Sequence, residues 1–309
     1  MKIGILHHDL EWTEKELKRI IDNLGHTAKT FDVRKTSVDK IKKEDLDIML
    51  NRVYASVGNR DYSSLQKTLE ILKELEKDNL LIINSFEATQ ADYSKYNSFE
   101  LMTKGEVSTP KTVLYNKNLD LNRIINELNG FPLIVKRDTG GRGKDLAKCD
   151  TKAELEKAIQ NINNSEDYQG GIIIQEFVNS TEDNDYRIWI IGGKFLFYHE
   201  RSLISLKEEE KPWLASRSLG SKILKPKREV AADLKEFAEK AAESIKADLD
   251  VLDVMKTKEG YLVIEHNPTP NIRPEYEGIL GFNVVEYFLK EILNSYRKNI
   301  KFPLQKNLD

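Results

Sequence analysis

The chain has 309 residues, of which 39% are hydrophobic, and its 48 Lys and Arg nearly balance its 51 Asp and Glu, giving a net charge of -3. This length can bury a sizeable core and is typical of about two domains. The charge balance argues against sequence-independent binding of nucleic acid, no segment approaches the roughly 18 apolar residues of a membrane span, and the first residues are not typical of a secretory signal. The single cysteine, Cys149, excludes an intramolecular disulfide and a thiolate zinc cluster. We therefore predict a cytoplasmic protein with neither a nucleic-acid nor a membrane partner; a homo-oligomer is left open.

Strand and helix patterns alternate over the first 90 residues. Apolar strands are expected at 2–6, 27–31, 47–53 and 80–83. Thr13 with Glu16 forms a capping-box pattern that predicts a helix after the first strand, and a second helix fits 63–76. This alternation predicts an open α/β sheet. His7-His8-Asp9 stands where a dinucleotide-binding turn would need glycines, so a Rossmann site is not expected, but the position after a strand leaves a substrate contact open for the histidines.

From about residue 95 the pattern changes to strands joined by hairpins and glycine turns. A helix at 119–128, a strand at 133–137, a helix capped by Thr151 and a strand at 172–178 make a compact unit. Two hairpins follow, over 185–201 and 251–266, separated by a polar loop and a helix over 229–247; a helix over 284–296 comes last. The whole chain is predicted to be of the α/β (α+β) class.

The second hairpin carries two acids that are expected to face each other. A three-residue loop that ends in glycine places Asp253 opposite Glu265 and Met255 opposite Val263. Asn267 lies two residues beyond Glu265 and therefore shares its face. Two carboxylates and an amide oxygen form the hard oxygen set that suits Mg²⁺ or Mn²⁺. The alternative is a hairpin whose polar face meets water.

A lysine and a glycine tract follow one another in the central part of the chain. Lys136 ends an apolar strand, where a lysine is costly without an anionic partner. The tract Gly140-Gly141-Arg142-Gly143 can bring backbone N–H groups and a guanidinium close to phosphates, although it is not a Walker A loop. The next strand ends at Glu176-Phe177-Val178, which suits an adenine edge but also fits an ordinary strand.

The first hairpin mixes charges on one face. A two-residue turn at Gly192-Gly193 puts Asp185, Arg187 and Glu200 on the same face and leaves Arg201 on the core side unless the strand bulges. The charged row is either a self-satisfied surface ladder or one wall of a site.

The order of these pieces resembles that of the ATP-grasp ligases, most closely the RimK-type carboxylate–amine ligases. The resemblance covers roughly residues 84–295 and is carried by Lys95, the Lys136 strand with its glycine loop, Glu176 to Val178, Asp185-x-Arg187, Glu200-Arg201, Asp253 and Glu265-x-Asn267-Pro. It implies an ATP-grasp fold with an N-terminal open α/β domain (1–90), a central lid domain (91–178) and a C-terminal domain with an antiparallel sheet (179–309). ATP would lie between the last two.

The resemblance also implies roles for individual residues. The ATP phosphates would contact Lys95, Lys136 and the glycine loop, and two Mg²⁺ would be held by Asp253, Glu265 and Asn267. The other implied cofactor contacts are to adenine (Glu176, Phe177, Val178), to ribose (Asp185) and near the phosphates (Glu200). Arg187 and Arg201 would contact the carboxylate or the acyl phosphate as catalytic residues. The further substrate candidates are Arg52, at the end of the third strand, Arg217 and Arg273.

The sequence departs from the family pattern at two positions. An Asn that family members often have is missing from the loop over 213–222, where Arg217 and Lys222 are candidates to replace it, and His266 stands where the family often has an apolar residue. The resemblance implies an ADP-forming ligase that joins an amino acid, glutamate by family frequency, to a carboxylate of a small molecule, peptide tail or carrier protein through an acyl phosphate. A small-molecule kinase and a catalytically silent nucleotide-binding protein are the alternatives, and the paired acids argue against the second.

Overall fold

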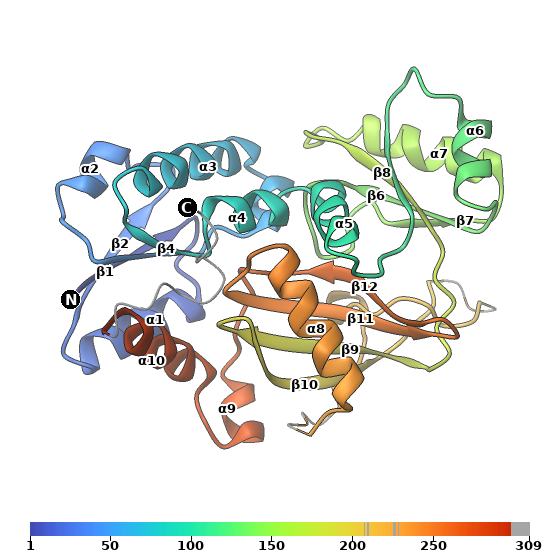
Figure 1. The fold of residues 1–309 in the computed structure, drawn as a ribbon. Helices are drawn as coiled ribbons and strands as arrows, with labels where there is room; N and C mark the ends of the chain where they lie inside the picture. Colours follow the sequence, from blue (N-terminus) through green and yellow to red (C-terminus); the bar gives the residue numbers. More distant parts are fainter. Residues whose placement is uncertain (207, 209, 225–226, 228, 298–309) are drawn as a thin grey trace.

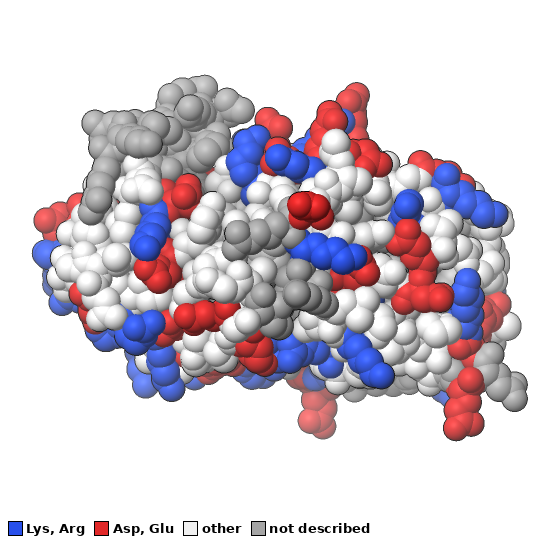
Figure 2. All heavy atoms as spheres, turned by 90° about the horizontal axis from the view of Figure 1, so that it is seen from below, with Lys and Arg blue, Asp and Glu red and all other residues white. Residues whose placement is uncertain are grey.

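The computed structural model describes residues 1–297 apart from 207, 209, 225, 226 and 228. The described part contains three four-stranded sheets, which follow one another along the chain (Figure 1). On the face seen in Figure 2, Lys and Arg side chains are interspersed with Asp and Glu side chains. No helix in the described residues is long and apolar enough to cross a bilayer.

The first sheet is parallel, with strand order β2-β1-β3-β4. Its strands are β1 Lys2–His7, β2 Thr27–Asp32, β3 Ile48–Asn51 and β4 Leu81–Ile83. Helix α1 (Trp12–Asn23) covers one face, and α2 (Val38–Lys42) and α3 (Tyr62–Glu76) cover the other (Figure 1). Ile3 and Ile5 pack into the core on the α1 side and Leu6 into the core on the α3 side. The predicted open α/β sheet is confirmed. Its strands are short apolar runs because helices cover both faces of the sheet.

Helix α1 begins before Thr13, so the predicted capping box is wrong. The N-cap residue is Glu11, whose backbone N–H donates to Glu14 Oε2 at 3.1 Å. The buried Thr13 hydroxyl instead donates to the Ile272 carbonyl oxygen at 3.1 Å. A contact with a distant part of the chain therefore uses the hydroxyl that the sequence pattern assigned to the cap.

The second sheet is antiparallel, with strand order β5-β8-β6-β7. Its strands are β5 Thr112–Tyr115, β6 Leu133–Arg137, β7 Ala147–Cys149 and β8 Ile172–Glu176, and its helices are α6 Leu121–Glu127 and α7 Lys152–Asn163. Two further helices, α4 Phe86–Asp92 and α5 Lys95–Lys104, connect it to the first sheet. The predicted capping box between Thr151 and Glu154 is present at the start of α7. Strands β5 and β7 were not predicted, because three or four residues are too few to show a strand period.

The third sheet is antiparallel, with strand order β10-β9-β11-β12. Its strands are β9 Asn184–Ile191, β10 Lys194–Ser202, β11 Leu249–Thr257 and β12 Gly260–His266. Helix α8 (Ala232–Ser244) covers one face through Leu234, Ala238 and Ala241, which pack with Ile188 and Val254 of the sheet. Two short 3₁₀ turns, Ala55–Asn59 and Arg217–Leu219, lie in the loops after β3 and after β10.

The last helices lead back to the first sheet. After α9 (Glu275–Leu280), α10 (Val284–Arg297) packs beside α1 (Figure 1). Val285 and Phe288 of α10 share one apolar core with Ile3 and Leu17, and Trp189 of β9 belongs to the same core. Each of the three predicted domains thus contains one sheet, while α10, inside the predicted 179–309 domain, packs on the first sheet. The boundaries themselves stay a prediction.

Candidate active site

Strands β11 and β12 bring the two predicted acids together. Asp253 pairs with Glu265, as expected, but by a different route. The turn has two residues rather than three, and a bulge beside Asp253 then restores the pairing. The expected pairing of Met255 with Val263 is wrong for the same reason, because Met255 pairs with Leu262.

A bulge in β10 decides which charged residues of the first hairpin face the site. The register shifts near the start of β10, so Arg201 pairs with Asp185 and lies on the same face as Arg187. Glu200 is thereby moved to the opposite face, where its Oε1 accepts a hydrogen bond from Lys227 Nζ at 2.6 Å. The prediction that Glu200 shares the face of Asp185 is therefore wrong.

A cavity of about 710 Å³ lies between the second and third sheets. Predicted site residues from both sheets and from the glycine loop line it, namely Lys95, Lys136, Gly140, Gly141, Arg142, Gly143, Glu176, Phe177, Val178, Asp185, Arg187, Arg201, Arg217, Asp253, Glu265, Asn267 and Arg273. Two predicted candidates, Arg52 and Glu200, are not in its lining.

Arg52 is buried in protein contacts away from the cavity. Its guanidinium donates to Glu14 Oε1 at 3.0 Å and to the Pro270 carbonyl oxygen at 2.8 Å, and the residue is 4% exposed. The structure thus replaces the expected substrate contact with a structural one: Arg52 ties the bend after Asn267 to the first sheet.

Two arginines and two aspartates form a buried network in the cavity wall. Arg201 binds Asp185 through two contacts, one of them from Nε to Oδ1 at 3.0 Å, and its Nη2 lies 2.9 Å from Asp253 Oδ2. Arg187 Nη1 donates to the other Asp253 oxygen at 2.7 Å. Burial opposes the charge of Arg201, but Asp253 and Asp185 together raise the pKa of its guanidinium, while burial raises the pKa of Asp185. The network fixes the Asp253 carboxylate and places two guanidinium groups beside it.

The predicted metal set combines two acids with an amide. No group of three or more His, Cys, Asp or Glu in the described part of the chain suits a metal ion. However, Mg²⁺ is usually held by one or two carboxylates plus substrate phosphates. Asn267 Nδ2 donates to the Val251 carbonyl oxygen at 3.3 Å, which leaves the amide oxygen for a ligand, and Glu265 is partly exposed beside it. This oxygen donor set, with Asp253 opposite Glu265, fits Mg²⁺ bound together with phosphate.

Lysines and the glycine loop surround these acids. Lys95 Nζ donates to the Gly140 carbonyl oxygen at 2.7 Å and lies 3.5 Å from Glu265 Oε1. Gly140 has φ of +125° and lies against the Asn59 side chain, which leaves no room for a Cβ. Asn59 Nδ2 donates to the Gly141 carbonyl oxygen at 3.2 Å. The loop after β3 therefore holds the glycine loop close to the acids.

The positive charge of Lys136 destabilises the folded protein when no nucleotide is bound. Burial lowers its pKa to about 8 from the ordinary 10.5. Because the pKa of Lys136 is lower in the folded protein than in the unfolded chain, its charge lowers the free energy of unfolding by the full amount below about pH 8. This effect shrinks as the pH rises and is gone above 10.5. Lys136→Met is therefore expected to leave the nucleotide-free protein as stable as the wild type, or up to about 2 kcal/mol more stable, at neutral pH. Urea unfolding at neutral pH and above pH 10 measures this: the gain should shrink at the higher pH, and a variant destabilised at neutral pH would contradict the argument.

The cavity lining also contains apolar and aromatic side chains. The rings of Phe177 and Trp213 lie edge to face with centroids 5.9 Å apart, and Lys148 Nζ is 4.9 Å from the centre of the Phe177 ring. Glu176 Oε1 accepts the Lys111 backbone N–H at 2.8 Å, so one of its oxygens is used within the sheet. Trp213 was not predicted, although a tryptophan in a polar loop was a usable signal. The other apolar and aromatic residues of the lining are Ile134, Leu146, Val178, Leu214, Ala215, Ile223, Met255, Ile264 and Tyr276.

Two of the three predicted substrate arginines line the cavity. Both Arg217 and Arg273 are in the lining, and Arg217 Nη2 lies 3.5 Å from Glu275 Oε1. Lys222, the other candidate to replace the family Asn, is not in the lining. Glu11, from the loop before α1, also lines the cavity and carried no sequence signal.

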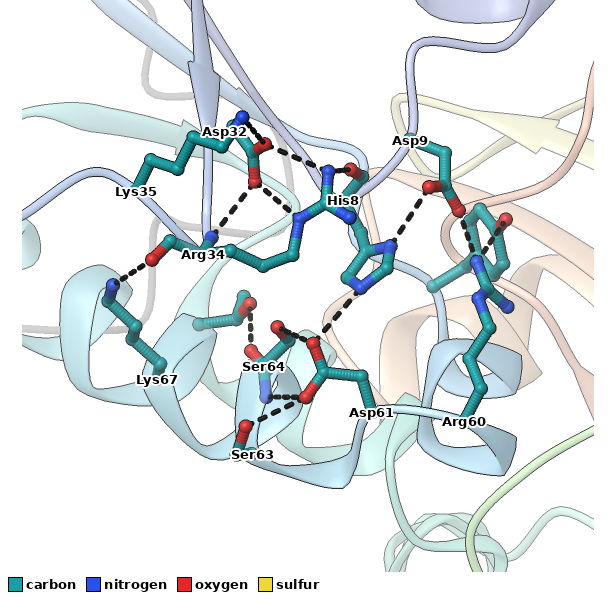
Figure 3. Close-up of polar contacts among 12 residues, drawn as sticks. His8, Asp9, Asp32, Arg34, Lys35, Arg60, Asp61, Ser63, Ser64 and Lys67 are labelled. Carbon is teal, nitrogen blue, oxygen red and sulfur yellow. Dashed lines mark hydrogen bonds and ion pairs between the residues drawn. The ribbon is translucent and has the colours of Figure 1, made fainter. Parts of the chain in front are cut away.

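The carboxyl ends of β1 and β2 carry a separate polar cluster (Figure 3). His8 is buried, with Nε2 3.1 Å from Asp61 Oδ2 and Nδ1 3.1 Å from Asp9 Oδ1. Arg34 Nη2 donates to the His8 carbonyl oxygen at 2.9 Å, and Arg60 contacts Asp9. His8, for which a substrate contact was left open, thus has an acid of the same chain beside each ring nitrogen and does not line the cavity.

The architecture is that of the ATP-grasp proteins. The structure matches that of D-alanine–D-alanine ligase from Bacillus anthracis, solved in complex with ATP, with a TM-score of 0.69 at 18% identity, over 97% of this chain and 98% of that chain. The predicted fold class is therefore confirmed.

Sequence comparison defines the family within that fold. Residues 92–292 match the model of the RimK-like ATP-grasp domain. The chain is 25% identical to the probable alpha-L-glutamate ligase 2 of Hahella chejuensis (96% of this chain, 98% of the relative) and 26% identical to the tetrahydromethanopterin:alpha-L-glutamate ligase of Methanosarcina acetivorans (95% and 99%). The chain belongs to the RimK-like ATP-grasp family and is an ATP-dependent ligase that forms C–N bonds.

Proposed function

We propose that the protein is an ADP-forming carboxylate–amine ligase that joins an amino acid to a carboxylate through an acyl phosphate. One observation carries the proposal: the Asp253–Glu265 pair, with Lys95 and Lys136 beside it, lines the same cavity as a set of apolar and aromatic side chains. The charged residues suit the phosphates of ATP, and the apolar residues, Phe177 and Trp213 among them, suit the base.

The charged residues of the cavity would have two roles in phosphoryl transfer, binding the phosphates and holding the metal ion. Lys95, Lys136 and the backbone N–H groups of the glycine loop would bind the phosphates and hold them in line with the acceptor carboxylate. Asp253, Glu265 and Asn267 would hold Mg²⁺ or Mn²⁺, two ions by family resemblance, which when bound neutralise phosphate charge.

An acyl phosphate must be kept from water, because hydrolysis would waste it. Ser218 Oγ donates to the Arg142 carbonyl oxygen at 3.2 Å, and Leu219 packs near Gly143. The loop after β10 and the glycine loop thus meet over the cavity. In the proposed reaction they exclude water while Arg187 orients the acyl group.

We propose glutamate or a similar acidic amino acid as the amine. The names of the two relatives above support this choice, and Arg217 and Arg273 in the cavity wall could each bind a carboxylate through two hydrogen bonds. The acceptor carboxylate is proposed only as a class: small molecule, peptide tail or carrier protein. A cytoplasmic location and a homo-oligomer stay predictions.

A coupled assay of ADP release tests the function. Amino acids and carboxylates are screened in pairs with ATP and Mg²⁺, and the product of each positive pair is analysed by mass spectrometry. We expect ADP release that depends on both partners, one phosphate per ADP, and an amide product. ADP formed together with a stable phosphorylated product would instead identify a kinase, and no partner-dependent ADP would reject catalysis.

A further inference from the structure

A second cavity, of about 180 Å³, adjoins the first and shares part of its lining. Both cavities have Lys95, Glu265 and Asn267 in their lining, so a molecule in the smaller one would lie next to the phosphates. The smaller cavity is also lined by Asp92, at the end of α4, and by Thr269 from the bend after β12.

Asp92 is an acid with few partners in the interior. It is 9% exposed, and its Oδ2 accepts a hydrogen bond from the Thr269 hydroxyl at 3.0 Å. Within the described ranges, no other hydrogen bond to its carboxylate and no ion pair is found. Burial raises its pKa to about 6. The charges of His266 and Lys95 oppose this rise, but neither side chain forms an ion pair with Asp92 in the described ranges, and a buried carboxylate is costly without a cation in direct contact.

The neighbouring cations are directed elsewhere. Lys95 Nζ binds the Gly140 carbonyl oxygen at 2.7 Å and lies 3.5 Å from Glu265. His266, on β12, has its Nδ1 3.7 Å from Asp250 Oδ2 on β11. These two side chains therefore act on Asp92 through their charge without an ion pair, and the carboxylate can still take a direct contact from a cation that enters the cavity.

The rim of the cavity has the opposite charge. Arg142 of the glycine loop lines it, with the guanidinium carbon 5.9 Å from the centre of the Tyr54 ring, and the residue is exposed. An acid inside and a guanidinium at the rim complement the ammonium and carboxylate of a zwitterion.

We propose that Asp92 binds the ammonium group of the amine substrate, an α-amino acid whose carboxylate is directed to Arg142. The proposal rests on the ligase function proposed above. It puts the amine next to the acyl phosphate. After one proton has gone to solvent, the nitrogen attacks the carbonyl carbon, so that a C–N bond forms and the C–O bond to phosphate breaks. Phosphate leaves with the electron pair, and a second proton goes to solvent.

The test compares a charged amine with an uncharged one. L-Glutamate, or the amine that replaces it in the ADP-release screen, is used beside hydroxylamine, which is uncharged above neutral pH and traps an acyl phosphate as a hydroxamate. For Asp92→Asn we expect the KM for the amino acid to rise about 10- to 100-fold. Hydroxamate formation and the KM for ATP should stay within about twofold of the wild type. An unchanged KM for the amino acid would overturn the proposal.

Glu76→Gln is the matched control. Glu76, the last residue of α3, is a partly buried acid that accepts the backbone N–H of Phe86, the first residue of α4, at 2.6 Å, and it lines neither cavity. We expect wild-type KM values from it, and an equal rise in both variants would indicate a structural effect and reject the site. If circular dichroism shows Asp92→Asn unfolded, Asp92→Ser is measured in its place. If the wild type forms no hydroxamate, the ligase function fails, which is a different result from an unchanged KM in the variant.

Discussion

Glu265→Gln is expected to lower amine-dependent ADP release by at least about 10²-fold while the protein stays folded. Glutamine keeps the shape of the side chain but removes the negative charge that faces Asp253 across the hairpin. The side chain is 35% exposed, and its ion pair with Lys95 is 3.5 Å long, so the free energy of unfolding should change by less than about 1 kcal/mol. Steady-state rates over a range of Mg²⁺ concentrations, with a parallel urea titration, measure both quantities.

Glu259→Gln provides the control for this experiment. Glu259 lies in the turn of the same hairpin, is exposed and does not line the cavity. The same chemical change there is expected to leave the rate and its Mg²⁺ dependence unaltered. A Glu265→Gln protein that matches the control would show that the metal assignment is wrong.

Arg201→Ala is expected to destabilise the protein by about 3–5 kcal/mol, in addition to any loss of activity. The buried Arg201 contacts both Asp185 and Asp253, so its removal leaves two carboxylates close together without that cation. Arg187 is more exposed and contacts only Asp253 among the acids described, so Arg187→Ala should cost less stability, roughly 1–2 kcal/mol. Urea unfolding compares the two variants.

Asp185→Asn in the Arg201→Ala background separates the pair interaction from general loss of packing. Because the amide removes one of the uncompensated charges, the double variant should regain part of the lost stability. Equal stabilities for the Arg187 and Arg201 variants would mean that the buried network does not hold Asp253 in place.

The acid pair was predictable from the sequence, but partly through two shifts that cancel. A three-residue loop without a bulge and a two-residue turn with a bulge both put Asp253 opposite Glu265. Alternation over strands of nine and seven residues is a strong signal, whereas a glycine permits several turn lengths between them. The face was therefore predictable, and the neighbours of Met255 were not.

A bulge was left open by the sequence, but its position at the start of β10 could not be predicted, because the residues around it are apolar on both faces. Phe195, Leu196 and Phe197 give no change of pattern when one is passed over. The shift nevertheless exchanges Glu200 and Arg201, which puts a cation rather than an acid beside Asp185.

Position at a strand end did not predict function for Arg52. Open sheets place ligands at the carboxyl ends of their strands, but that rule concerns the backbone and not the direction of a side chain. Arg52 turns to Glu14 and Pro270. Asp92 was not predicted to belong to a site. An acid on a short helix looks the same in the sequence whether its side chain is exposed or lines a cavity.

The bend after β12 is fastened to the first sheet at three carbonyl oxygens. Asn84 Nδ2 donates to Pro268 at 2.6 Å, Arg52 to Pro270 at 2.8 Å and the Thr13 hydroxyl to Ile272 at 3.1 Å. The region that matches the family begins at residue 92, beyond all three donors. Chimeras that exchange the amino-terminal third between relatives must therefore carry residues 268–272 with it, or the graft will leave buried carbonyls without donors immediately downstream of Asn267.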